Sequence, residues 1–274
     1  MYKEKFSLID SITNIKNIIT GEERIMEFTI SAYTDMLDLL KEHNYYICDY
    51  TNYEDPKKSV ILRHDIDFNL QSGVEIAKIE YSKNIKSPYF VLLSTNFYNI
   101  FSKESNDMLK LIIGMGHKIG LHFDEKKYKI ENSNDLEYYV SFESEILGKA
   151  IGKEIRTVSM HRPSKWILEN DIRFENVINS YSKEFLHQFK YLSDSRMHWR
   201  EDTIEIIKSE QYDKLHILTH PFWYSNKSER IETKLFDFID ASRLNTFKNL
   251  KDNFRDLEEY IDEDTLNGVD FNAR

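Results

Sequence analysis

Short apolar runs alternate with amphipathic helical segments through the middle of this chain, and no other feature constrains its fold as strongly. We predict buried strands at residues 59–62, 88–93, 117–122, 156–161, 203–207 and 215–220. Helices are predicted at residues 6–20, 32–43, 70–84, 103–113, 134–151 and 228–262. Strands that alternate with helices form right-handed β-α-β units. The expected fold class is therefore α/β with a parallel sheet.

Charge and cysteine content exclude several classes of protein. The formal net charge is -10, which disfavours non-specific binding to nucleic acid because such binding needs a basic surface. Cys48 is the single cysteine, so the chain forms no intramolecular disulfide and no cysteine-based zinc site. Because Cys48 follows the apolar residues Tyr45, Tyr46 and Ile47, we predict a buried structural thiol.

The N-terminal residues and the length of the apolar stretches indicate the compartment of the protein. Charges at residues 3–5 interrupt the N-terminus too early for a signal peptide. No stretch reaches the roughly 18 uncharged apolar residues that would suggest a membrane span. The cytoplasm is the expected compartment, and an exported polymer would be a substrate only before its export. The sequence leaves a monomer and a homo-oligomer both open.

Polar residues suited to catalysis stand where the predicted strands end. They are Asp65, Asp67, His122, His161, Arg162 and His220. In a parallel barrel the carboxyl ends of the strands gather on one face, and catalytic groups lie on that face. We therefore expect these side chains to meet in one site.

Asp65 and Asp67 are two residues apart, so on an extended strand they point to the same side. Two carboxylates this close repel each other unless a cation or a proton lies between them. A divalent metal bound by one of them, with the other as base, resolves this conflict. The alternative is that Asp67 caps the helix that follows. His122 offers an imidazole ligand, a type that zinc sites favour.

The segment at residues 161–163 offers further groups. His161 is equally compatible with a metal ligand and with a core histidine. Arg162 can hold a carboxylate in a fixed fork geometry, and Pro163 turns the chain sharply after it.

His220 is a candidate general acid, because a histidine of near-neutral pKa suits that role. Asp194 is expected to orient His220 and to tune its pKa. Trp223 and Tyr224, just after His220, are expected to form an aromatic lip on which a sugar ring stacks.

Taken in order, these segments resemble the polysaccharide deacetylase family, the family 4 carbohydrate esterases, in its divergent His-Asp-x-Asp branch. The resemblance covers roughly residues 59–224 and is carried by four motifs. They are Arg63-His64-Asp65-Ile66-Asp67, Gly116-His117-Lys118-Ile119-Gly120-Leu121-His122, His161-Arg162-Pro163-Ser164 and Leu218-Thr219-His220-Pro221. It implies a distorted (β/α) barrel and hydrolysis of N-acetyl or O-acetyl groups on sugars.

The resemblance also implies roles for single residues. Asp65 matches the catalytic base, Asp67 and His122 match metal ligands, Arg162 matches the arginine that holds the base, and His220 matches the catalytic acid. The implied cofactor is a divalent metal ion, with zinc as the expected one.

One position departs from the family pattern. Lys126 stands where the family has its second metal-binding histidine. His161 could supply the third ligand instead, or Asp124 or Glu125 could, or the site could lack a metal. We favour His161, because a neighbouring strand end can reach the same point.

The expected function is metal-dependent removal of an acetyl group from an N-acetylated sugar or a glycoconjugate precursor, with a backbone N–H near Pro163 at the oxyanion. The alternatives are a metal-independent amide hydrolase on the same fold and a non-catalytic carbohydrate-binding protein. We expect a mainly helical N-terminal extension over residues 1–55, the barrel over 56–226, and a C-terminal helical region over 227–274 that packs on the barrel.

Overall fold

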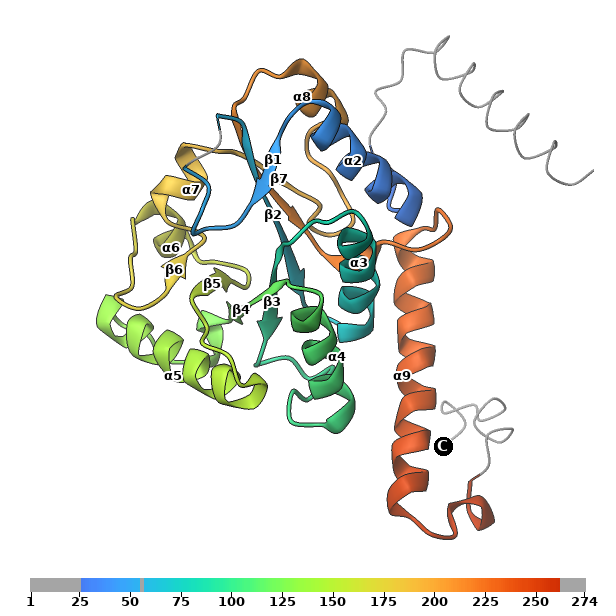
Figure 1. The fold of residues 1–274 in the computed structure, drawn as a ribbon. Helices are drawn as coiled ribbons and strands as arrows, with labels where there is room; N and C mark the ends of the chain where they lie inside the picture. The colour runs from blue at the N-terminus through green and yellow to red at the C-terminus, as the bar shows by residue number, and fades with distance from the viewer. Residues whose placement is uncertain (1–25, 55–56, 262–274) are drawn as a thin grey trace, which may run out of the picture. The chain divides into compact units, whose positions relative to one another are not determined.

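The computed structural model describes residues 26–54 and 57–261 (Figure 1). The chain divides into a larger unit that ends at Ser228 and a smaller unit that begins at Glu229. The predicted helix at residues 6–20 lies outside the described residues. No helix in the described part is long and apolar enough to cross a membrane.

The larger unit is built on one sheet in which every paired strand is parallel to its neighbour. The order is β6-β5-β4-β3-β2-β8-β7, and β1 pairs with β2. The strands are β1 (Tyr46–Cys48), β2 (Ser59–Ile66), β3 (Pro88–Leu92), β4 (Lys118–Phe123), β5 (Thr157–Met160), β6 (Ile178–Asn179), β7 (Lys190–Ser193) and β8 (Lys214–Thr219). The predicted parallel α/β sheet is confirmed.

The sheet curls on itself. Three strands separate β2 from β6 in the sheet order. Arg63 of β2 nevertheless donates hydrogen bonds to Ser180 Oγ at 2.7 Å and to the Tyr181 hydroxyl at 3.0 Å, both just beyond β6. Contact across the concave side between such distant strands requires strong curvature, as in the expected distorted (β/α) barrel.

Helices connect the strands around the outside of the sheet (Figure 1). They are α2 (Ile30–Glu42), α3 (Leu70–Ser82), α4 (Lys103–Gly114), α5 (Ser133–Ile151), α6 (Lys165–Glu169), α7 (Lys183–His187) and α8 (Thr203–Ser209), with 3-10 turns η1 (Glu125–Lys127) and η2 (Pro221–Trp223). The predictions over residues 32–43, 70–84, 103–113 and 134–151 match α2, α3, α4 and α5.

The strand predicted at residues 203–207 is wrong, because this segment is α8. Its residues Thr203-Ile204-Glu205-Ile206-Ile207 alternate in polarity like a strand. However, the Asp202 side chain accepts a hydrogen bond from the Glu205 backbone N–H at 3.0 Å and so caps a helix. The helix cap therefore decides the structure of this segment, despite the alternating polarity of its residues.

The smaller unit consists of α9 (Ile231–Asn253) and the 3-10 turn η3 (Leu257–Glu259). Among the described residues of this unit, Phe247 and Leu257 are the buried apolar ones. The predicted helical character of residues 228–262 is seen here. The packing of this region on the barrel, and the domain boundaries at residues 55 and 226, stay predictions.

A buried polar cluster ties β2 to α3 on the outer side of the sheet. Glu80 of α3 is fully buried, and its carboxylate accepts hydrogen bonds from Tyr33 at 2.8 Å, Ser87 at 2.9 Å and Tyr89 at 2.5 Å. His64 Nε2 lies 2.9 Å from the same carboxylate. Burial alone would raise the pKa of Glu80, but His64 and the other donors outweigh it, so the pKa is lowered.

Replacing Glu80 with alanine should destabilise the protein by about 3–5 kcal/mol, because removal of a buried charged partner leaves its neighbours unpaired. Since its pKa is lowered in the folded state, the carboxylate stabilises the fold above its ordinary pKa of 4.5 and loses that effect as the pH falls. Urea unfolding followed by circular dichroism measures both effects. Glu75→Ala, at an exposed position of the same helix, is the control. Equal stability of the two variants would contradict the role of Glu80.

Candidate functional site

The predicted acids and histidines meet at the carboxyl end of the sheet. Asp65 lies at the end of β2 and Asp67 just beyond it, while His122 lies near the end of β4. His122 Nε2 is 3.2 Å from Asp67 Oδ1 and 3.8 Å from Asp65 Oδ2. Parallel strands bring their carboxyl ends together, and this explains why residues far apart in sequence are neighbours here.

Asp67, His122 and His161 form a group that could hold a metal ion, with ligand atoms within 4.8 Å of one another. His161 follows β5, and its Nε2 lies 4.0 Å from Asp67 Oδ2. Burial is the main cause that lowers the pKa of His161, which favours the neutral imidazole that a metal requires.

Asp67 has the chemistry of a ligand. Its Oδ1 is buried and faces His122 Nε2 at 3.2 Å, but it accepts no hydrogen bond of good geometry from the described residues. Burial would raise the pKa of Asp67, but the neighbouring His122, His220 and His161 together hold it well below its usual range. A carboxylate with an orphaned oxygen beside two imidazoles fits a divalent cation.

Asp124 and Glu125, the other ligand candidates, have different partners. Asp124 Oδ2 lies 3.3 Å from His161 Nδ1, on the side of that ring away from Asp67. Glu125 accepts a hydrogen bond from the Ser164 backbone N–H at 2.5 Å. Asp124 therefore fixes the orientation of His161, as carboxylates behind metal-binding histidines do.

Asp65 is buried, and Arg63 holds it. Arg63 Nη2 donates to Asp65 Oδ2 at 3.2 Å, and the Ser159 hydroxyl donates to the same oxygen at 3.1 Å. Asp65 Oδ1 accepts no hydrogen bond from the described residues, so this oxygen can accept a proton.

The prediction that Arg162 holds Asp65 is wrong. The Arg162 side chain is 64% exposed and pairs with Asp124 at 3.1 Å. Arg162 lies beyond the end of β5 with a φ of 49°, outside the sheet geometry that would direct its side chain inward. Arg63 takes the role instead. Its position two residues before Asp65, on the same face of the strand, was the available sequence signal.

His220 and Asp194 form a close pair. His220 Nδ1 lies 2.6 Å from Asp194 Oδ1, and the His220 backbone N–H donates to the same carboxylate. Tyr224 donates to Asp194 Oδ2 at 3.1 Å. Burial lowers the pKa of His220, but the charge of Asp194 outweighs it and raises the pKa to about 9. His220 is therefore protonated at neutral pH, with Nε2 3.9 Å from Asp67 Oδ2.

The predicted aromatic lip of Trp223 and Tyr224 is wrong, because each is only 5% exposed. The Tyr224 ring packs on Tyr33, and its hydroxyl supports Asp194. Accessible rings come instead from residues next to them in space. Phe68, directly after Asp67, packs on Phe222 and Phe97 with centroids 4.5 and 5.5 Å away, and Phe97 is 57% exposed.

Pro163 is half-buried and has no N–H of its own. The next backbone N–H, that of Ser164, already donates to Glu125. The Ser164 N–H is therefore not available to bind an oxyanion.

No protein-family model and no curated protein matches the chain. Among solved structures, the chain is similar to a CE4 family pseudoenzyme from Bacillus anthracis, with a TM-score of 0.41 and 15% identity over 69% of this chain and 63% of that chain. The chain thus spans less than two thirds of that protein's length.

Two further structures have similar scores. A family 4 carbohydrate esterase from Bacillus anthracis has a TM-score of 0.38 and 18% identity, covering 77% of this chain and 86% of the other. The chitin deacetylase from Colletotrichum lindemuthianum has a TM-score of 0.39 and 14% identity, covering 67% of this chain and 81% of the other. At this level of similarity, any assignment of chemistry depends on the side chains of the site itself.

Proposed function

We propose that the chain is a metal-dependent hydrolase that removes the acetyl group from an N-acetylated sugar or a glycoconjugate precursor. One observation carries the proposal. The three residues that could hold a metal, Asp67, His122 and His161, have two neighbours suited to proton transfer. Asp65, a buried carboxylate with a free oxygen, lies 3.8 Å from His122, and the protonated His220 lies 3.9 Å from Asp67. Amide hydrolysis needs a base and an acid on either side of the carbonyl carbon.

Asp67, His122 and His161 would hold the metal, and we propose zinc because the donors are nitrogen and oxygen. When bound, a divalent ion supplies Lewis-acid chemistry, which activates water and polarises a carbonyl oxygen. Asp124 keeps the His161 ring turned so that Nε2 faces Asp67.

Asp65 and His220 move the protons. Asp65 Oδ1 accepts a proton from the attacking water, while Arg63 and Ser159 hold the other oxygen in place. His220 Nε2 donates a proton to the nitrogen of the departing amine, and Asp194 stabilises the imidazolium before that transfer. The products are acetate and a free amino sugar.

The aromatic rings beside Asp67 suit a sugar substrate. Phe97 is more than half exposed, and Phe68 connects it to the metal-ligand group through Asp67. Aromatic faces bind the apolar faces of sugar rings, whereas the polar groups around Asp65 would act on the acetamide.

The test combines metal analysis with acetate release. The purified chain should contain a divalent metal and release acetate from a member of a panel of N-acetyl sugars that includes nucleotide-linked ones. His161→Ala should weaken metal binding by at least about 10-fold, because loss of a ligand exceeds the 10- to 100-fold effect of losing an outer partner. His187→Ala, which removes an exposed histidine from α7, is the control and should retain full occupancy.

Each other outcome would support a different function. Acetate release without metal would indicate a metal-independent amide hydrolase. Metal binding without turnover of any panel member, together with retained sugar binding, would indicate a non-catalytic carbohydrate-binding protein.

A further inference from the structure

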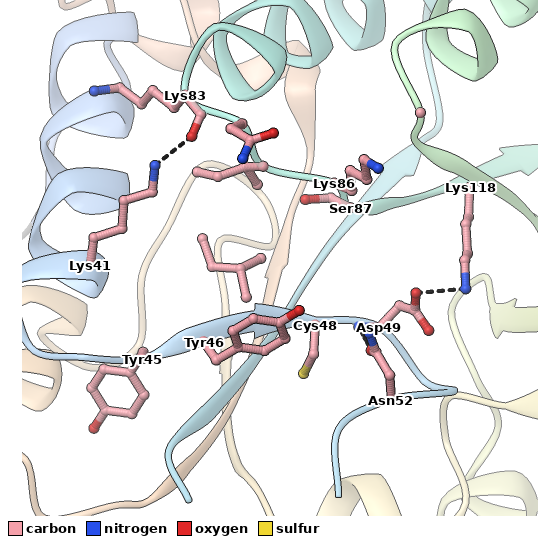
Figure 2. Close-up of a pocket in the computed structure, with 14 residues that line it drawn as sticks. Lys41, Tyr45, Tyr46, Cys48, Asp49, Asn52, Lys83, Lys86, Ser87 and Lys118 are labelled. Carbon is pink, nitrogen blue, oxygen red and sulfur yellow. Dashed lines mark hydrogen bonds and ion pairs between the residues drawn. The ribbon is translucent and has the colours of Figure 1, made fainter. Parts of the chain in front are cut away.

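A cavity lies at the amino end of the sheet, opposite the site described above. It has a volume of about 460 Å³, and its walls come from β1 and from the segments that lead into β3 and β4 (Figure 2). Ser59 of β2 lies level with Tyr46 of β1, whereas Asp65 is six residues farther along β2. At about 3.3 Å per residue, roughly 20 Å of sheet separates the two levels.

The charge of this cavity contrasts with that of the whole chain. Four lysines, Lys41, Lys83, Lys86 and Lys118, line it, and Asp49 is the one carboxylate among the lining residues. The chain as a whole has a net charge of -10. A cationic hollow on an acidic protein selects anions locally, because nearby charges outweigh distant ones that salt screens.

Two of these lysines have no carboxylate partner in the part of the chain that the structure describes. Lys118 pairs with Asp49 at 2.6 Å, and Lys83 pairs with Asp38 at 2.5 Å. Lys41 donates to the backbone carbonyl of Lys83, which carries no net charge (Figure 2). Lys86 lines the same hollow and is exposed. The ammonium groups of Lys41 and Lys86 therefore leave positive charge to be balanced by a ligand.

An aromatic residue also lines this cavity. Tyr46 of β1 is among the lining residues and is 55% exposed. A large ring that remains exposed in a cavity lined by lysines offers a stacking face for a ligand whose anionic part the lysines bind. The volume is within the range that encloses a small molecule.

We propose that this cavity binds a nucleotide, with Lys41 and Lys86 at the phosphates and Tyr46 against the base. Lysine ammonium groups bind phosphate as point charges, and an aromatic face accepts any base by stacking. The proposal is independent of the hydrolase chemistry, because it uses none of the same residues.

Isothermal titration of the full chain with ADP and with inorganic pyrophosphate tests the proposal. ADP should bind, and Lys41→Ala and Lys86→Ala should each weaken that binding by about 10-fold, the usual effect of losing one charge-assisted hydrogen bond. Tyr46→Ala should weaken binding of ADP but not of pyrophosphate. Lys129→Ala, which removes an exposed lysine that pairs with Glu131, is the control and should bind like the wild type.

A second control separates this cavity from the metal-ligand group. His161→Ala should bind ADP as the wild type does, whatever its hydrolase activity. Loss of ADP binding in that variant would overturn the proposal, since the nucleotide would then bind at the other end of the sheet. Absence of ADP binding, or affinity unchanged by both lysine substitutions, would overturn it as well. Equal effects of Tyr46→Ala on the binding of ADP and of pyrophosphate would overturn the stacking of the nucleotide base on Tyr46.

Discussion

Replacing Asp65 with asparagine should lower acetate release by roughly 100- to 10,000-fold, the range for losing a general base. An amide oxygen at this position still accepts hydrogen bonds from Arg63 and Ser159, so the geometry around it is preserved. It cannot take a proton from water. Because Asp67, His122 and His161 are untouched, metal occupancy should stay at the wild-type level. The measurement is kcat/KM for acetate release, with metal content determined on the same sample.

The partner of Asp65 adds a condition to this experiment. Arg63 is fully buried, and Asp65 is its only carboxylate ion-pair partner among the described residues. The asparagine leaves the guanidinium charge unbalanced, and a loss of about 3–5 kcal/mol of stability is expected. Activity should therefore be measured well below the melting temperature of the variant.

Ser159→Ala is the matched control for Asp65→Asn. It removes the hydroxyl that donates to Asp65 Oδ2 and that lies 3.1 Å from His122 Nδ1, but it keeps the carboxylate. With metal content matched to the wild type, turnover should fall by about 10-fold, as expected for the contacts of one hydroxyl. If Asp65→Asn were as active as the wild type, Asp65 would not be the base.

The arrangement of the site could be predicted from sequence because it depends on strand ends. Asp65, His122, His161 and His220 each stand at or just after an apolar run, and a parallel sheet brings such positions together. The order of the apolar runs along the chain was enough to predict that these side chains meet, and no knowledge of the loops was needed.

The ion-pair partner of Asp65 could not be predicted in the same way. Arg162 and Arg63 both lie close in sequence to polar residues of the site. Which of them reaches Asp65 depends on backbone direction, and Arg162 has a left-handed φ beyond its strand whereas Arg63 lies within β2. The position of an arginine within a motif does not show which way its side chain points. The alternation of side chains along a strand does, because residues two apart lie on the same face.

Short elements were also missed. β1 and β6 have three and two residues, and runs of this length carry too little periodicity to be recognised. The polar cluster around Glu80 was missed because its donors come from separate parts of the chain, from Tyr33 to Tyr89. Only the packing of α3 on the sheet brings them together.

Replacing Asp194 with asparagine should impair turnover at pH 8, by up to the roughly 100- to 10,000-fold effect of losing a general acid, because a smaller share of His220 would be protonated there. The pKa of His220 is about 9 since Asp194 outweighs the effect of burial. Without that charge the pKa should fall, because burial lowers it and only Asp67 and Asp65 still raise it. An acid acts only while protonated, so the alkaline decline in rate should begin at lower pH in the variant than in the wild type.

Tyr224→Phe separates the charge of Asp194 from the hydrogen bonds around it. It removes only the hydroxyl that donates to Asp194 Oδ2, and the ring can keep its contact with Tyr33. Its loss should be about 10-fold or less, with the alkaline decline close to that of the wild type. An NMR titration of the His220 ring reports the same pKa shift without any substrate. An unshifted titration in Asp194→Asn would show that Asp194 does not set the charge of His220, and the acid would then have to be sought among other groups.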